Sequence, residues 1–136
     1  MGFRIARKGI ELALTLKLLE GEFKICRLSA ESTLPPAALA ADWFSITKTD
    51  DELSVVVGVS AEFPCDSVET GWAMFKLLGP FAFDLTGIVA GISKVIAAAN
   101  IGIFVISTYD TDYILIKQNN LATATTALIS AGYKLI

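Results

Sequence analysis

The chain has 136 residues, which suits one ordinary domain or two very small ones. Apolar residues make up 54% of it and charged residues only 18%, a composition that excludes an intrinsically disordered protein. The net charge is −3 and there is no basic cluster, so we expect no nucleic-acid partner, because that binding depends on neutralising phosphates with Lys and Arg.

Two further features of the composition concern self-association and the available chemistry. The low charged fraction indicates that a second copy covers some apolar surface, so we expect a homodimer, although a tight single core would also explain it. The chain has no histidine, which removes the commonest general base and the commonest metal ligand. We therefore expect neither a metal nor another cofactor.

The N-terminal apolar run Ile10–Leu19 follows basic residues and superficially resembles a signal peptide. Glu11 and Lys17 interrupt it, however, and no small-residue cleavage pattern follows. No stretch approaches the roughly 20 apolar residues of a membrane-spanning helix. We expect a cytoplasmic protein that does not bind membranes.

The first predicted strand covers Glu11–Leu19. Its leucines alternate with other residues and share one face: Leu12, Leu14, Leu16 and Leu18. Glu20-Gly21-Glu22 is a turn signal, and a second strand starts at Phe23 and continues to either Arg27 or Leu28. The pattern predicts a β-hairpin.

The rest of the first half is rich in strand signals. Pro35-Pro36 opens the short stretch Ala37–Ala41, which predicts one or two helical turns. Trp43–Thr47 is the next predicted strand, and the valine-rich run Leu53–Val59 indicates a strand buried on both faces. Cys26 and Cys65 have no CxxC spacing, so we expect two unbridged thiols.

A polar stretch, Asp66–Gly71, predicts the boundary between a first module, residues 1–70, and a second, residues 71–136. The second module is predicted as strand, helix, strand, strand, helix, strand: Trp72–Leu78, Ile88–Ala99, Ile101–Ser107, Asp112–Lys117, Leu121–Ser130 and Tyr133–Ile136. This order defines an α+β, ferredoxin-like βαββαβ unit, with an antiparallel sheet and helices on one face. The first module has at least four strands and one weak helix, so we expect a reduced relative of that unit.

Both predicted helices of the second module are amphipathic. The first places on one side Ile88, Ile92, Val95, Ile96 and Ala99. Thr86 or Asp84 can cap its start, and Asn100 and Gly102 can relieve its left-handed exit. The apolar side of the second helix comprises Leu121, Ala124, Leu128 and Ile129.

Three segments of the second half resemble ACT domains. The stretch 79–89, GPFAFDLTGIV, resembles the family's loop from its first strand to its first helix, and the stretch 97–107, AAANIGIFVIS, resembles its helix end and second strand. The segment 106–114, ISTYDTDYI, is similar to the hairpin of ACT domains in aspartate kinases and CASTOR-type arginine sensors. The resemblance covers residues 72–136 well and residues 10–71 only by length and strand content, and the whole chain is most similar to small bacterial tandem-ACT proteins.

The resemblance implies an amino-acid-binding regulatory protein rather than an enzyme, with the ligand at an interface between ACT modules. The implied ligand-binding residues are Asp84, Leu85, Thr86, Gly87, Ile88, Gly102, Ile103, Phe104, Ser107, Thr108 and Asp112. The first module lacks a matching T-G-I loop, so one ligand loop per chain is expected. Implied partners are a free amino acid and an enzyme or regulator; the alternative is a dimerisation module that has lost its ligand.

The residues themselves allow two interpretations. The backbone N–H groups after Gly87 can bind a ligand carboxylate at a helix start, or simply belong to a capped helix. Asp112 can pair with an ammonium group, or be an exposed turn carboxylate like Asp110. Ser107 and Thr108 can contact a ligand or only end a strand, and Phe104 can line a pocket or join the core.

A catalytic use of two carboxylates is the remaining hypothesis. If Asp110 and Asp112 both lay on an extended strand, they would point to the same face, as an acid/base pair needs. The missing histidine and the lack of a nucleophile motif argue against an enzyme.

Overall fold

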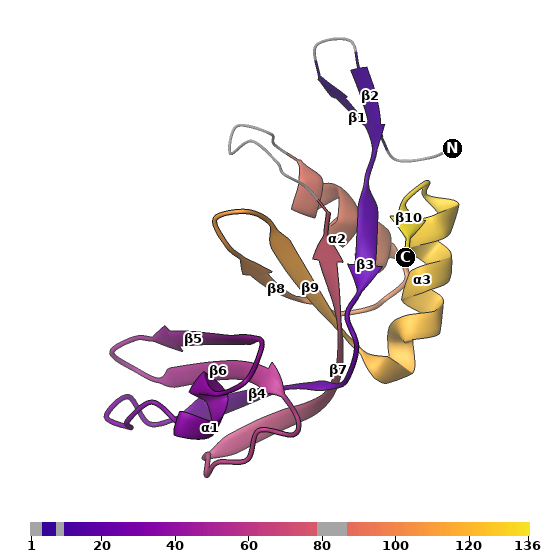
Figure 1. Ribbon diagram of the computed structural model, residues 1–136. Helices are drawn as coiled ribbons and strands as arrows, with labels where there is room; N and C mark the ends of the chain where they lie inside the picture. The colour runs from indigo at the N-terminus through magenta and orange to yellow at the C-terminus, as the bar shows by residue number, and fades with distance from the viewer. Residues whose placement is uncertain (1–3, 8–9, 79–86) are drawn as a thin grey trace. The chain divides into compact units, whose positions relative to one another are not determined.

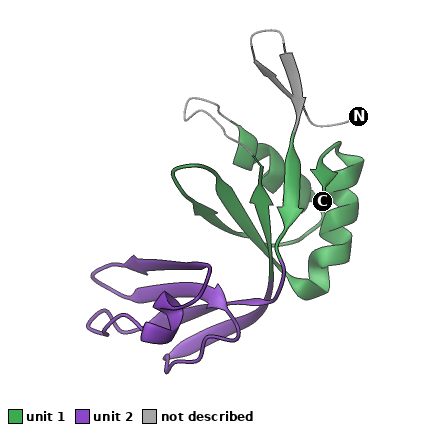
Figure 2. Cartoon of the chain, viewed as in Figure 1, with its two compact units in different colours: residues 1–19, 73–136 green, residues 20–72 purple. Residues whose placement is uncertain are grey.

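Ten strands and three α-helices make up the part of the chain that the computed structural model describes, which is residues 4–7, 10–78 and 87–136 (Figure 1). The chain divides into two compact units (Figure 2). Unit 1 comprises residues 1–19 and 73–136, and unit 2 comprises residues 20–72. The α+β fold with ferredoxin-like modules that the sequence predicts is confirmed.

Unit 1 is built on one sheet, whose strand order is β10-β3-β7-β9-β8. These strands are β3 (Thr15–Leu18), β7 (Ser67–Leu77), β8 (Phe104–Ser107), β9 (Asp112–Lys117) and β10 (Lys134–Leu135). The two helices are α2 (Ile88–Ala98) and α3 (Leu121–Ser130), which contact each other. The order along the chain from β7 to β10 is the predicted strand, helix, strand, strand, helix, strand.

Strand β3 is an additional strand of this sheet and is not part of the βαββαβ pattern. It pairs antiparallel with β7 and parallel with β10, so it separates these two strands. The amide of Ile136 donates to the Leu16 carbonyl (3.0 Å), and the amide of Leu18 donates to the Ile136 carbonyl (2.9 Å). This pairing differs from the predicted division at residues 70 and 71, which assigns β3 to the first module.

The core of unit 1 lies between the sheet and its helices. Strand residues two apart share a face, and the buried face carries Leu14, Leu16, Phe75, Leu77, Ile114 and Ile116. Against it lie the buried residues of the helices: Ile88, Ile92, Ile96, Ala124 and Leu128. The predicted apolar side of α2 is therefore confirmed, whereas Ile129 on α3 is wrong, since it is 56% exposed.

Unit 2 is a four-stranded sheet with one short helix. Its order is β7-β4-β6-β5, and β7 contributes only its first half. The other elements are β4 (Phe23–Leu28), α1 (Pro36–Leu39), β5 (Phe44–Lys48) and β6 (Leu53–Gly58). Its core contains Cys26, Leu28, Ala38, Leu53, Val55 and Val57. Val56 is also buried, so the expected burial of the valine run on both faces is confirmed.

One sequence prediction about the first half is wrong. The expected hairpin does not form, because β3 pairs with β7 and β10, and β4 pairs with β6 and β7, so β3 and β4 do not pair with each other. Most of the polar stretch Asp66–Gly71, which the sequence predicts as the boundary between the modules, is the first half of β7. Its side chains are mostly exposed and polar, so the sequence pattern gives no sign of a strand. The ladder of a strand is formed by backbone groups.

A separate pair of strands precedes unit 1's sheet in the sequence. β1 (Arg4–Arg7) pairs antiparallel with β2 (Ile10–Ala13). The sequence predicts one strand over 11–19, and the structure instead has two, β2 and β3, separated at Leu14.

Neighbouring residues on α3 test the packing of unit 1. Leu128→Ala should lower the free energy of unfolding by about 2–5 kcal/mol, because a fully buried side chain leaves a cavity. Ile129→Ala, on the exposed side, should change it by less than about 1 kcal/mol. Urea denaturation followed by circular dichroism measures both. Equal losses would contradict the assignment of the buried side of α3.

Candidate functional site

The start of α2 carries two of the predicted site residues. Gly87 has φ 84°, in the left-handed region where glycine is favoured, and precedes Ile88, the first residue of the helix. Within α2, the amide of Gly91 donates to the Gly87 carbonyl (2.9 Å). The amides before Gly91 have no partner within the helix, and no side chain caps them among the described residues. Asp84, Leu85 and Thr86 lie outside the described residues.

The β8–β9 hairpin carries three more. Ser107 lies opposite Asp112 in the ladder, and its hydroxyl donates to the Asp112 carboxylate. The Thr108 amide donates to the Thr111 carbonyl (2.8 Å), and the Thr111 amide donates to the Thr108 hydroxyl (3.3 Å). These bonds close the turn, so Asp112 has a fixed position at the start of β9.

A buried hydroxyl connects this hairpin to the end of β7. Thr111 is 9% exposed, and its hydroxyl donates to the carbonyl of Leu77, the last residue of β7. The chain leaves β7 at Leu77 and reaches α2 at Ile88. The hairpin turn therefore lies at the sheet end where the chain departs towards α2. Thr111 is not among the site residues that the sequence predicts, because no local pattern signals a hydrogen bond to a residue 34 positions away.

Gly102, Ile103 and Phe104 lie at the other end of β8. Phe104 pairs with Leu115, three positions along the ladder from the Ser107–Asp112 pair. A strand advances about 3.3 Å per residue, which separates the two ends of β8 by roughly 10 Å. The structure thus brings Ser107, Thr108 and Asp112 together but does not place the other three beside them.

Asp110 and Asp112 do not have the arrangement that the acid/base hypothesis requires. Asp110 is an exposed residue of the turn, and β9 begins only at Asp112, so the two do not alternate on one extended strand.

In the described part of the chain, no group of three His, Cys, Asp or Glu residues could hold a metal ion. The helices of that part are also too short or too polar to cross a membrane.

This arrangement supplies groups of opposite polarity. The first turn of α2 offers amide hydrogens and the positive end of a helix dipole, which attract anions. Asp112 offers a carboxylate, of which one oxygen accepts the Ser107 hydroxyl. A carboxylate has acceptor sites for more than one donor, so Asp112 can still accept hydrogen bonds from a cation.

Comparison with known proteins identifies the second half. An ACT-domain family model matches residues 67–130, and a model of an N-terminal domain matches residues 21–60. The human cytosolic arginine sensor for mTORC1 subunit 1 is 29% identical over 103 residues, which cover 70% of this chain and 31% of the sensor. The chain thus spans about a third of that relative's length.

Solved structures extend the similarity to the whole chain. A crystal structure from Agrobacterium tumefaciens has a TM-score of 0.84 and 43% identity, covering 92% of this chain and 93% of that chain. The ligand-free regulatory subunit of aspartate kinase from Thermus thermophilus has a TM-score of 0.60 at 12% identity, covering 85% and 96%. The second similarity shows the fold alone.

The βαββαβ order of unit 1 and the family match define the class: this is an ACT-domain protein. Within that class, the chain belongs to the same family as the Agrobacterium tumefaciens protein, which it matches over nearly its full length.

Substitution of Gly87, with Gly102 as the control, tests the left-handed backbone conformation at the start of α2. A Cβ at Gly87 meets no described atom within 4 Å, so Gly87→Ala should lose stability only through its left-handed φ, by about 1 kcal/mol. Gly102 is equally open but is not left-handed, so Gly102→Ala should change stability by less than about 0.5 kcal/mol. Thermal unfolding of both variants measures the difference. If Gly87→Ala were as stable as Gly102→Ala, the left-handed conformation would be refuted.

Proposed function

We propose that this ACT-domain protein binds a free amino acid beside the start of α2 and acts as a regulatory sensor without catalytic activity. The observation that carries the proposal is the connection of the β8–β9 hairpin to Leu77 through Thr111. That connection holds Asp112 at the sheet end from which the chain departs towards α2. A ligand between them would meet amide hydrogens on one side and a carboxylate on the other.

The two charges of an amino acid match these two groups. Its carboxylate would accept hydrogen bonds from amides in the first turn of α2, where the helix dipole favours negative charge. Its ammonium group would donate to Asp112, as a charge-assisted hydrogen bond. Glycine at 87 lets the ligand approach the backbone without a side chain in between. We propose that Asp84, Leu85 and Thr86 also bind the ligand, and that Ser107 and Thr108 lie at the rim of the site.

The remaining predicted residues favour a second ACT module in the binding site. Gly102, Ile103 and Phe104 lie at the opposite end of β8, roughly 10 Å from the Ser107–Asp112 pair, so a small amino acid beside Asp112 would not reach them in the same chain. If they contact ligand, they contact one held by another module. We therefore propose that the ligand lies at an interface between ACT modules and that the chain forms a homodimer.

Named relatives support the regulatory role. The human relative is an arginine sensor, and the Thermus thermophilus structure is a regulatory subunit of a kinase. By analogy with them, we propose that the bound amino acid changes how this chain meets an enzyme or regulator.

One observation favours the alternative, a dimerisation module without ligand. Unit 1 exposes large apolar side chains, among them Leu18, Ile129 and Ile136. Such residues can form an interface whether or not a ligand binds. Light scattering with and without amino acids separates the two functions, because only a sensor can show assembly that depends on the amino-acid concentration.

Two nearby aspartates test the ligand site. Isothermal titration calorimetry against each of the twenty standard amino acids, up to millimolar concentration, should find at least one that binds. Asp112→Asn should weaken that binding by roughly 10–100-fold, since a hydrogen bond to a charged group contributes about 1.5–3 kcal/mol. Asp110→Asn removes an equal charge from the exposed turn and should change the affinity less than about threefold. If none of the twenty amino acids bound, or if both variants weakened binding equally, the proposed function would be refuted.

A further inference from the structure

Both cysteines of the chain lie in unit 2, on the same side of its sheet. Cys26 is on β4, is 1% exposed and belongs to the apolar core cluster of the unit. Cys65 lies in the segment between β6 and β7, is partly exposed and packs against the same cluster. Neither is in a disulfide. The sequence predicts two unbridged thiols, but it gives no sign that the two cysteines lie next to each other.

The segment that carries Cys65 runs alongside β4. At one point the ammonium of Lys24 lies 5.0 Å from the centre of the Phe63 ring, a cation–π contact. Three residues further along both segments, the amide of Asp66 donates to the Arg27 carbonyl (2.8 Å). Residues 63–66 thus lie alongside residues 24–27 in the same order, so Cys65 lies next to Cys26.

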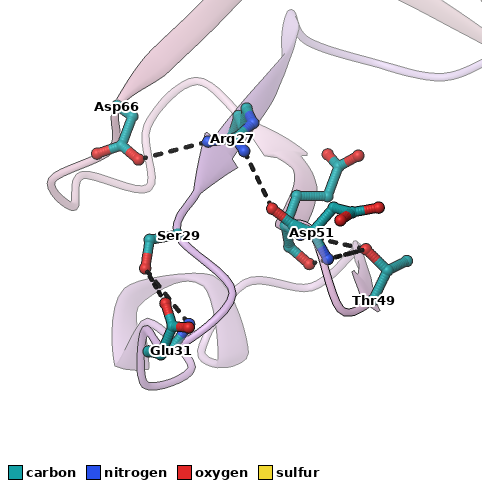
Figure 3. A network of polar contacts seen from close by, with 7 residues as sticks. Arg27, Ser29, Glu31, Thr49, Asp51 and Asp66 are labelled. Atoms are coloured by element: carbon teal, nitrogen blue, oxygen red, sulfur yellow. Dashed lines mark hydrogen bonds and ion pairs between the residues drawn. The ribbon is translucent and has the colours of Figure 1, made fainter.

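Side-chain contacts hold this end of the segment in place (Figure 3). The Arg27 guanidinium lies 3.6 Å from the Asp66 carboxylate and donates to the Asp51 carbonyl (3.0 Å). The ion pair is half-exposed and contributes little alone. Together with the backbone bond from Asp66, it restricts where the neighbouring Cys65 can lie.

The two thiols interact directly. Burial, and to a smaller extent the neighbouring Cys65 to which Cys26 is hydrogen-bonded, raise the pKa of Cys26 to about 11, although Lys24 acts in the opposite direction. Cys26 therefore stays a thiol at neutral pH and is shielded from solvent. Cys65 is the sulfur that a dissolved reagent can reach first.

We propose that Cys26 and Cys65 form an oxidation site, at which hydrogen peroxide converts the two thiols into one intramolecular disulfide. Cys65 attacks a peroxide oxygen, giving a sulfenic acid and one water. The Cys26 sulfur then attacks the sulfenic sulfur: the S–S bond forms, the S–O bond breaks, and the hydroxyl leaves with the Cys26 proton as a second water. Two thiols are oxidised and one peroxide is reduced to two waters.

The disulfide would fix the β6–β7 segment to β4. It would close a loop containing α1, β5 and β6, and cross-links over long loops restrict the unfolded chain most. Oxidation should therefore stabilise unit 2, and a thiol reductant should reverse the effect. The inference does not rest on the proposed amino-acid site, whose residues all belong to unit 1.

Mass spectrometry of the full chain tests the site. After hydrogen peroxide treatment and denaturing alkylation with iodoacetamide, the wild-type chain should be lighter by about 2 Da, take up no alkyl group and give a Cys26–Cys65 cross-linked peptide. Reduction should restore two alkylated thiols. The oxidised protein should melt roughly 5–15 °C higher than the reduced protein.

Single variants provide the controls. Cys65→Ser should leave Cys26 alkylable after peroxide treatment, and Cys26→Ser should leave Cys65 to gain oxygen atoms or to link two chains. The proposal is overturned if wild-type Cys65 gains two or three oxygens while Cys26 remains alkylable. It is also overturned if the wild-type disulfide joins two chains, as seen on a non-reducing gel.

Discussion

The structure depends on the antiparallel pairing of one strand, β7, with partners that come from distant parts of the sequence. Its first residues, Ser67–Trp72, pair with β4, and Phe75–Leu77 pair with β3. The same strand pairs with β9. Because these backbone bonds fix where β7 ends, they also fix Leu77, the acceptor of the Thr111 hydroxyl. The position of Asp112 thus follows from the ladder of β7, not from the hairpin alone.

Periodicity predicted the elements of the second half because their faces differ so clearly. The residues Ile88, Ile92 and Ile96 recur at helical spacing and are all buried. The same reasoning failed where pairing is not local. The alternating leucines identified a strand near residue 16, but nothing in them indicates that its neighbours are β7 and β10. The polar side chains of Asp66–Gly71 gave no sign of a strand, because the strand there is held by backbone hydrogen bonds.

The candidate site shows the same division between local and distant information. The left-handed Gly87 and the helix after it follow from residues that adjoin in the sequence. The Thr111–Leu77 bond joins residues 34 positions apart, and Gly102 and Ser107 are separated because residues 104–107 form an extended strand between them. The resemblance to ACT domains implies ligand-binding residues at both ends of β8. The structure shows that these residues form two separate groups.

The most direct test of amino-acid binding at this place is an NMR titration of the 15N-labelled chain with the amino acid that binds in calorimetry. Hydrogen bonds to a ligand carboxylate shift the resonances of the donating amides. We expect the largest shifts at Ile88, Val89 and Ala90 in the first turn of α2, together with Asp112. Shifts confined to residues 20–72, with the start of α2 unchanged, would contradict binding at this site.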